Sequence, residues 1–239
     1  MNQLIDPNGN DIPVTSIDGW EKKRADILDR VQSIMGPLPG DEKRCDLDVV
    51  IGEEVDCDTY VRRLISYQSE PDSRTPAYLL IPKKALKDGI SCPAVLCPHP
   101  THAQDGFKTV VGLSDKPNRA YASELAERGF VTLAPSYPLL ANYQPDWRAL
   151  GYESGSMKAI WDNMRVLDVL ETLPFVAPGK VGSIGHSLGG HNSIYTAVFE
   201  SRIGVVVSSC GLDSYVDYKD GDLTGWTSDR YMPKLKDYV

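Results

Sequence analysis

The stretch "KVGSIGHSLGGH", residues 180–191, constrains the fold more than any other part of the chain. Small and β-branched residues at 181–184 predict a strand, and a helical pattern begins directly after Ser187, so the serine stands in the turn between them. Such a tight turn presses backbone segments together, and glycine is needed at Gly185 and Gly189, where a Cβ would collide. A G-x-S-x-G sequence in this strand-turn-helix setting is typical of a nucleophile elbow.

The helix after Ser187 directs its N-terminal amides and the positive end of its dipole at the serine. We therefore expect the backbone N–H of Leu188 to be the first donor of an oxyanion hole. The competing interpretation is an ordinary strand-helix turn in a nucleotide-binding fold. The chain contains neither G-x-G-x-x-G nor a Walker lysine, so that interpretation is less favoured.

The order of strand-like and helix-like segments predicts the class of fold. Three β-rich segments predict an antiparallel meander, and alternating strands and helices follow it. The result is an α/β fold with a mostly parallel sheet and antiparallel strands at its first edge. We assign residues 1–40 to an N-terminal helical extension and residues 41–239 to one α/β domain. The expected helices are 16–36, 118–129, 155–174 and 189–200, and the expected strands are 45–51, 59–67, 76–82, 92–100, 130–138, 180–185 and 203–209.

Charge and composition exclude several classes of function. The formal net charge is -8 and no basic run occurs, so we expect no nucleic-acid or membrane partner. No apolar run approaches the roughly 20 residues of a membrane-crossing helix. Residues 1–13 lack the pattern of a secretory signal, which favours a cytoplasmic protein, although a signal peptide already removed would leave the same sequence. The 5 cysteines include no C-x-x-C pair, and we expect no disulfide framework, metal or organic cofactor.

A second oxyanion donor should come from the loop after the strand at 94–98, which reads "HPTHAQDGFKT". We expect the backbone N–H of Thr101 to complete the oxyanion hole, while His99 and His102 shape the pocket. The alternative is a surface turn rich in proline and glycine. Neither histidine suits the role of catalytic base, because both precede Ser187, whereas the order in this kind of fold is serine, acid, histidine.

Longer motifs carry a resemblance to a known family, among them "CPHPTHAQDG", "ELAERGFVTLAPSYP", "SGSMKAIWDNMRVLDVLETLP" and "GKVGSIGHSLGGHNSIYTAVFE". From about Trp20 onward the chain resembles bacterial α/β-hydrolases of the dienelactone-hydrolase-like and acetyl-xylan-esterase-like kind. The resemblance implies the α/β-hydrolase fold, with Ser187 as nucleophile and Leu188 and Thr101 lining the oxyanion hole. Dienelactone hydrolases proper have cysteine at the position of Ser187, so we expect a serine esterase.

The family pattern also places an acid after a late strand and a histidine after the last one. Residues 210–239 are too few for two further βα units of about 30 residues each. We therefore expect a C-terminally incomplete hydrolase domain, with the catalytic histidine beyond the end of the chain. Asp213 is the candidate acid, and a turn aspartate is the competing interpretation. His191, the only histidine after Ser187, lies one helical turn beyond it and is expected to pack rather than act as the base.

Together these residues predict a serine hydrolase that acts on small-molecule carboxylic esters through an acyl-enzyme intermediate. One alternative is a truncated or degenerate, non-catalytic α/β-hydrolase that binds a ligand or partner through its exposed sheet edge. Another is a prolyl-oligopeptidase-type peptidase, which shares the elbow. An incomplete sheet would expose apolar surface, so self-association into a homo-oligomer is also expected. Within the helix at 155–174, Trp161, Asp162 and Arg165 predict a structural ion pair beside a buried tryptophan.

Overall fold

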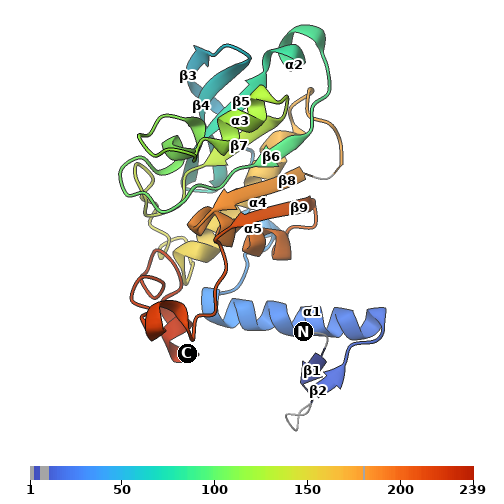
Figure 1. Ribbon diagram of the computed structural model, residues 1–239, viewed down its shortest axis with the longest axis vertical. Helices are drawn as coiled ribbons and strands as arrows, with labels where there is room; N and C mark the ends of the chain where they lie inside the picture. Colours follow the sequence, from blue (N-terminus) through green and yellow to red (C-terminus); the bar gives the residue numbers. More distant parts are fainter. Residues whose placement is uncertain (1–2, 6–10, 180) are drawn as a thin grey trace.

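A seven-stranded mixed sheet forms the centre of the molecule (Figure 1). The computed structural model describes residues 3–5, 11–179 and 181–239, so Lys180 and much of the N-terminal stretch considered above lie outside the described residues. The strand order is β3-β4-β5-β7-β6-β8-β9, and a separate hairpin is formed by β1 (Gln3–Ile5) and β2 (Asp11–Pro13). The strands of the large sheet are β3 (Val50–Asp56), β4 (Tyr60–Glu70), β5 (Ser73–Pro82), β6 (Ala94–Leu96), β7 (Val131–Pro135), β8 (Val181–His186) and β9 (Ile203–Ser209).

The first edge of the sheet is the predicted antiparallel meander. β3 pairs with β4, β4 pairs with β5, and β5 pairs with β7, each time antiparallel. The first strand differs from the expected 45–51, because it begins at Val50 and continues to Asp56. Nearly all of its residues are exposed, and an edge strand exposed in this way carries no alternation of buried and exposed side chains from which its bounds could be predicted.

The parallel half of the sheet determines where a site can form. β6 pairs in parallel with β7 on one side and with β8 on the other, and β9 pairs in parallel with β8. The chain runs from β6 outward to β7 and then crosses back to β8, so the order of strands reverses between β6 and β8. In open α/β sheets the crevice at the carboxyl ends of two such strands is the usual place for a ligand.

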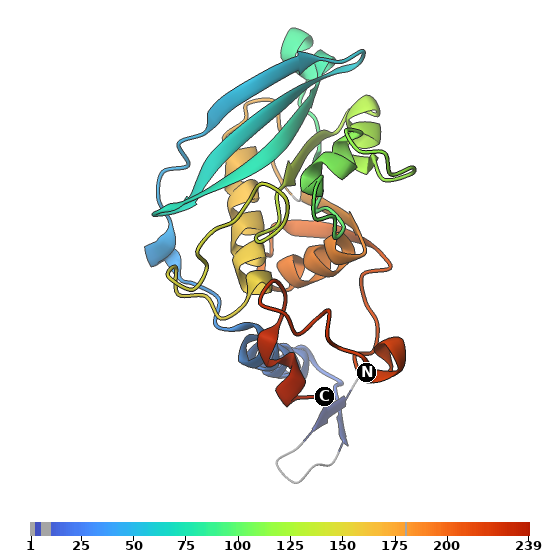
Figure 2. The same cartoon turned by 90° about the vertical axis from the view of Figure 1, so that its left-hand side faces the viewer.

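Helices cover both faces of the sheet (Figure 2). α4 (Gly155–Glu171) and α5 (Leu188–Phe199) pack on one face, and α3 (Tyr121–Glu127) and the short 3-10 helix η2 (Gly106–Val111) pack on the other. The strand β6 contributes to both layers, because Leu96 lies in the core beneath α4 while Val95 lies in the core beneath α3 and η2. A strand buried on both faces was predicted here from its continuous apolar run, and the burial of all three β6 residues confirms it.

One part of the α3 face has no helix over it. β9 is the edge strand, and Val205 and Val207 are 65% and 49% exposed. They line an apolar groove of about 310 Å³ together with residues of β6, β8 and the α3 region, among them Val95, Phe130 and Ile184. The exposed sheet edge and apolar surface expected from the sequence are therefore present, and we call this surface the β9 groove.

The N-terminal helix α1 (Ile17–Met35) lies at one end of the molecule, beside the C-terminal segment (Figure 1). Its start is fixed by Ser16, whose side chain accepts the backbone N–H of Gly19. The helix was predicted at 16–36, and only the later part of its apolar stripe meets the core: Trp20 is 52% exposed, whereas Val31 and Ile34 pack against the cluster that contains the buried Met35. Within the described part of the chain, no helix is long and apolar enough to cross a membrane.

A buried ionic network fixes α4 to the end of β4. Lys158 and Asp162, one turn apart on α4, pair with each other, and Lys158 Nζ lies 3.0 Å from the carboxylate of Glu70. The ion pair predicted beside Trp161 is therefore present with a different partner, since Arg165 pairs with Asp168. The reason is geometric: residues four apart share a helix face, and Lys158 and Asp162 both face β4.

Candidate active site

Ser187 occupies a strained turn between β8 and α5. Its backbone has φ +54° and ψ -120°, a conformation that a non-glycine residue adopts only when its surroundings impose it. The backbone N–H of Ser187 donates to Ser209 O at 2.7 Å, so the turn is anchored to the end of β9. The serine stands directly before the N-terminus of α5, and its side chain lines two cavities.

Two glycines make this turn sterically feasible. A Cβ on Gly185 would lie 2.1 Å from the carbonyl carbon of Gly189, and a Cβ on Gly189 would lie 2.2 Å from Pro98 O. Both distances are far inside van der Waals contact, and in each case the obstacle is backbone that cannot move aside cheaply. The second contact also shows that the loop after β6 lies against the first turn of α5.

That loop brings Thr101 to the same cavities as Ser187. Thr101 Oγ1 shares a hydrogen bond of 2.8 Å with the hydroxyl of Tyr231, which ties the loop to the C-terminal segment. Leu188 is buried at the start of α5 and lines one of the two cavities. The structure thus brings together Ser187, Leu188 and Thr101 from two parts of the chain, as an oxyanion hole would require.

Two cavities meet at Ser187 and Thr101. The aromatic pocket, of about 150 Å³, is formed mainly by the C-terminal segment and is lined by Thr101, Ser187, Leu188, Tyr218, Lys219, Asp222, Gly225, Trp226 and Tyr231. The basic pocket, of about 290 Å³, shares Thr101 and Ser187 with the aromatic pocket and is lined by Pro100, Thr101, His102, Thr109, Lys116, Pro117, Arg119, His186 and Ser187. A substrate with two groups flanking a central carbonyl can therefore place one group in each pocket.

His99 is buried and does not face either cavity. Its Nδ1 donates to Pro100 O at 2.8 Å, and its Nε2 accepts the backbone N–H of Tyr137 at 2.9 Å. The donor at Tyr137 fixes the neutral tautomer with the proton on Nδ1, and burial lowers the pKa of His99 to about 4. His99 was expected to shape the pocket, but it lines neither cavity and instead supports the loop after β6 through these two hydrogen bonds.

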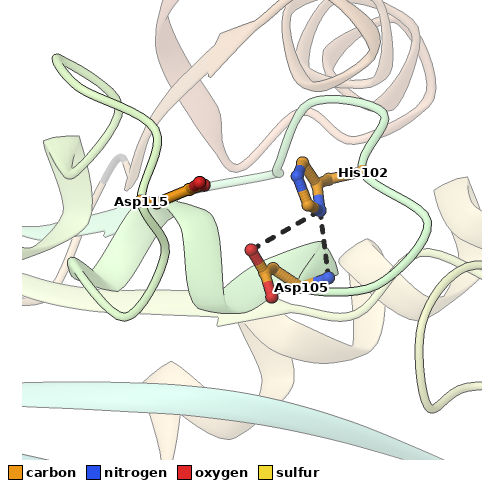
Figure 3. A group of neighbouring side chains, drawn as sticks. All are labelled: His102, Asp105 and Asp115. Carbon is orange, nitrogen blue, oxygen red and sulfur yellow. Dashed lines mark hydrogen bonds and ion pairs between the residues drawn. The ribbon is translucent and has the colours of Figure 1, made fainter.

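His102 does line the basic pocket, within a cluster that also contains Asp105 and Asp115 (Figure 3). His102 Nδ1 accepts the backbone N–H of Asp105 at 3.0 Å, and the Asp105 carboxylate accepts the hydroxyl of Ser114 at 2.7 Å. The atoms that would ligate a cation lie within 4.8 Å of one another, and these hydrogen bonds already occupy His102 Nδ1 and one carboxylate oxygen of Asp105. The cluster fixes the orientation of His102 at the edge of the pocket.

The other two histidines flank Ser187 in sequence. His186 lines the basic pocket, its Nδ1 lies 3.0 Å from Ser209 Oγ, and partial burial together with the Arg119 charge lowers its pKa. His191 is buried under the C-terminal segment, where its Nε2 lies 3.0 Å from the Tyr215 hydroxyl and its ring packs on Trp226. Burial lowers the pKa of His191 to about 3, as suits a packing residue.

Asp213 lies in an exposed turn after β9. Its Oδ1 accepts the backbone N–H of Ser214 at 2.8 Å, which is the contact of a turn aspartate. Among the described residues, no histidine shares a hydrogen bond with Asp213 or with Ser187 Oγ. The structure therefore brings Ser187, Leu188 and Thr101 to one cavity, but within the residues described it forms no serine-histidine-acid triad.

Sequence reasoning missed several residues of the site. Lys116 and Arg119 line the basic pocket, and Tyr231 lines the aromatic pocket while holding Thr101. Lys116 and Arg119 follow η2 in a polar loop that carries no motif, and Tyr231 meets Thr101 across 130 positions of sequence. The one available signal is the aromatic content of residues 210–239, which include Tyr218, Trp226 and Tyr231.

The strand order, the elbow and the position of the β6 loop define the class: this is an α/β-hydrolase fold. The family model described as "Prolyl oligopeptidase family" matches residues 118–237, just over half of the chain. The chain belongs to this family, and it is a hydrolase of the α/β-hydrolase type.

Comparison with individual proteins gives distant relatives. The chain is 26% identical over 223 residues to YtaP of Bacillus subtilis (strain 168), a protein provisionally named as a hydrolase, and the match covers 89% of this chain and 73% of that protein. Among solved structures, a glucuronoyl esterase from Solibacter usitatus has a TM-score of 0.72 at 19% identity, covering 98% of this chain and 71% of its own. Acetyl xylan esterase 1 from Thermoanaerobacterium sp. JW/SL YS485 has a TM-score of 0.56 at 19% identity, covering 88% and 70%.

The chain is shorter than these proteins. It spans 53% of a Bacteroides fragilis NCTC 9343 structure that is provisionally assigned as an acetyl xylan esterase, with a TM-score of 0.59 and 18% identity. At such identities the structural likeness establishes the fold, which these carboxylic ester esterases share with this chain.

Proposed function

We propose that this chain carries the acyl-transfer site of a serine hydrolase that cleaves carboxylic esters. Ser187 attacks the ester carbonyl, and the backbone amides of Leu188 and Thr101 hold the oxyanion that forms. The observation that carries the proposal is the backbone of Ser187, at φ +54° and ψ -120°, with glycines on both sides that no other residue can replace. The structural likeness to glucuronoyl and acetyl xylan esterases supports an ester substrate.

An ester suits this site better than an amide for a chemical reason. Expulsion of an amine requires a general acid to protonate the leaving nitrogen, whereas an alcohol, and above all a phenol, leaves more readily as the anion. No described histidine is hydrogen-bonded to Ser187 Oγ, so a reaction that depends less on proton transfer is favoured. Asp213 stays the candidate acid of the sequence prediction, and a base would have to be brought to Ser187 for full activity.

Covalent labelling tests the nucleophile directly. We expect a fluorophosphonate probe to label the purified chain at Ser187 and to leave Ser187→Ala unlabelled, with the modified peptide identified by mass spectrometry. Equal labelling of the two proteins, or none of either, would refute the proposal. Heat-denatured protein is the control, because labelling that depends on the elbow is lost when the chain unfolds.

The peptidase alternative is favoured by one observation, the match to the prolyl oligopeptidase family. Turnover of 4-nitrophenyl acetate and of a prolyl 4-nitroanilide, compared at equal enzyme concentration, separates the two activities. We expect measurable hydrolysis of the ester, lost in Ser187→Ala, and hydrolysis of the anilide at least a hundredfold slower. Faster turnover of the anilide would support the peptidase, and labelling without turnover of either would support a non-catalytic binding protein.

A further inference from the structure

The basic pocket has a charge that a neutral ester would not use. Its lining contains Lys116 and Arg119 together with His102 and His186, and no carboxylate is among its lining residues. Two acids lie beside the lining residues: an Asp105 carboxylate oxygen is 3.6 Å from His102 Nδ1, and the carboxylate of Asp115, which is 86% exposed to water, is 3.9 Å from the ammonium group of Lys116. Because both side chains of the Lys116–Asp115 pair are exposed to water, their attraction is largely screened. The ammonium charge of Lys116 therefore stays available to a ligand.

The guanidinium of Arg119 is also available. Within the described part of the chain, Arg119 donates from Nη1 to Asn118 O at 3.2 Å and shares no ion pair with an acid. Its charge reaches His186, which lies beside Ser187. A planar donor with free N–H groups is suited to a carboxylate, which can accept two of them at once.

A buried hydroxyl points to a ligand independently of these charges. Thr109 lines the basic pocket and is 2% exposed, and its Oγ1 has no hydrogen-bond partner among the described residues. A buried hydroxyl without a partner costs about 1–3 kcal/mol, so such groups normally have one. An oxygen acceptor bound in the pocket would supply it.

We propose that the basic pocket binds a carboxylate carried by the substrate, so that the preferred esters are anionic ones with a free carboxylate a few bonds from the scissile carbonyl. The proposal rests on the proposed function, in which Ser187, a lining residue of this pocket, attacks the carbonyl. The carboxylate accepts from Arg119 and Thr109 and lies near the ammonium group of Lys116. The aromatic pocket, which Ser187 also lines, receives the remaining part of the substrate.

Binding to the Ser187→Ala variant tests this without any turnover. Isothermal titration compares monomethyl succinate, which carries one carboxylate, with dimethyl succinate, which carries none. We expect the monoanion to bind about tenfold more tightly, in keeping with a charged hydrogen bond to Arg119. Equal affinity within this pair, and also within the pair that carries its carboxylate in the alcohol part, would overturn the proposal.

Three variants, each made in the Ser187→Ala background, locate the preference. We expect Arg119→Gln and Lys116→Gln each to reduce it about three- to tenfold, and the isosteric Thr109→Val to reduce it about threefold. The matched control is Arg128→Gln, because Arg128 is a surface arginine on the far end of the α3 region and outside both pockets. Loss of the preference in Arg128→Gln, or its retention in all three pocket variants, would overturn the proposal.

A second pair of esters distinguishes a carboxylate in the acyl part of the substrate from one in the alcohol part. O-acetyl lactate carries its carboxylate in the alcohol part, and its methyl ester is the neutral match. Preference for the anion in one pair assigns that side of the substrate to the basic pocket, and preference in neither pair refutes the proposal. Failure of fluorophosphonate labelling would refute the catalytic proposal alone, because these titrations use a chain without the serine.

Discussion

His99 Nε2 accepts the backbone N–H of Tyr137 at 2.9 Å, which joins the loop after β6 to the segment after β7. The same imidazole donates from Nδ1 to Pro100 O, one residue before Thr101. A single buried side chain therefore satisfies two backbone groups that secondary structure leaves unpaired. It also determines the path of the loop that carries one of the two proposed oxyanion donors.

His99→Leu should consequently be costly. The substitution leaves the N–H of Tyr137 and the carbonyl of Pro100 buried without partners, and we expect a loss of about 2–4 kcal/mol in the free energy of unfolding. Urea unfolding followed by circular dichroism measures it. Gln104→Leu, an exposed position in the same loop, is the control and should change the stability by less than about 0.5 kcal/mol. Similar losses for both variants would show that the His99 hydrogen bonds contribute nothing.

A fall in pH should destabilise the fold already at pH values above those at which most carboxylates become protonated. Burial lowers the pKa of His99 to about 4 and that of His191 to about 3, so both stay neutral in the folded protein at pH 5. The unfolded chain binds their protons near pH 6.5. Their contribution to stability is thus fully present above pH 6.5 and is lost as the pH falls toward 3–4, at up to about 1.4 kcal/mol per pH unit for each histidine.

Urea unfolding at intervals between pH 7.5 and pH 5 checks this slope. We expect His191→Phe, which keeps an aromatic ring between Tyr195 and Trp226, to lower the slope by about one proton. A wild-type stability that does not change across this interval would contradict the buried, neutral state of both histidines.

The elements that could be predicted from sequence are those determined by local patterns. The apolar stripe of α4, the continuous apolar run at β6 and the glycines around Ser187 each lie within one stretch of chain, and the structure has the elements that they predict. The predicted start of β3 was wrong because an exposed edge strand has no buried face that would mark its bounds in the sequence. The predicted ion-pair partner of Asp162 was wrong because the pairing with Lys158 depends on which face of α4 meets β4, and that is a tertiary contact.

The candidate site likewise has one part that local sequence predicts and another that depends on tertiary contacts. The turn at Ser187 is local and its residues are adjacent in sequence, so the elbow can be predicted. The two pockets are built from the β6 loop, the polar stretch around Lys116 and Arg119, and residues 218–231, which meet only in the folded chain. No periodicity or motif encodes such a meeting of loops, and the charge of the basic pocket could not be inferred before the structure.

Lys158→Met should be among the most destabilising substitutions outside the site. Lys158 has no exposed surface, and it pairs with the buried carboxylates of Glu70 and Asp162. Removal of the ammonium group leaves buried Asp162 without its cation and leaves Glu70 paired with Lys43 alone, and we expect a loss of about 3–5 kcal/mol. Lys83→Met breaks a pair with the exposed Asp56 and should cost less than about 1 kcal/mol. Equal effects in urea unfolding would refute the structural role of the network.

The β9 groove should bind an apolar dye and promote self-association. Val205 and Val207 are exposed on an edge strand above an apolar groove of about 310 Å³, and such a surface is stabilised when another apolar surface covers it. We expect Val207→Lys to reduce the fluorescence of anilinonaphthalene sulfonate several-fold and to shift the sedimentation profile toward monomer. Val216→Lys is the control, since Val216 is 69% exposed but lies outside the groove. A dye signal that responds equally to both variants would refute this assignment.

Gly189→Ala tests the elbow without touching the serine. Its new Cβ would lie 2.2 Å from Pro98 O, so the β6 loop must move away from α5 and carry Thr101 with it. We expect a loss of about 1–3 kcal/mol in the free energy of unfolding and at least a tenfold fall in the rate of fluorophosphonate labelling. Gly182→Ala, in the strand β8 that precedes the elbow, is the control, because its Cβ would meet Val95 at an ordinary 3.5 Å. Normal labelling of Gly189→Ala would show that the contact between Gly189 and Pro98 does not hold the site together.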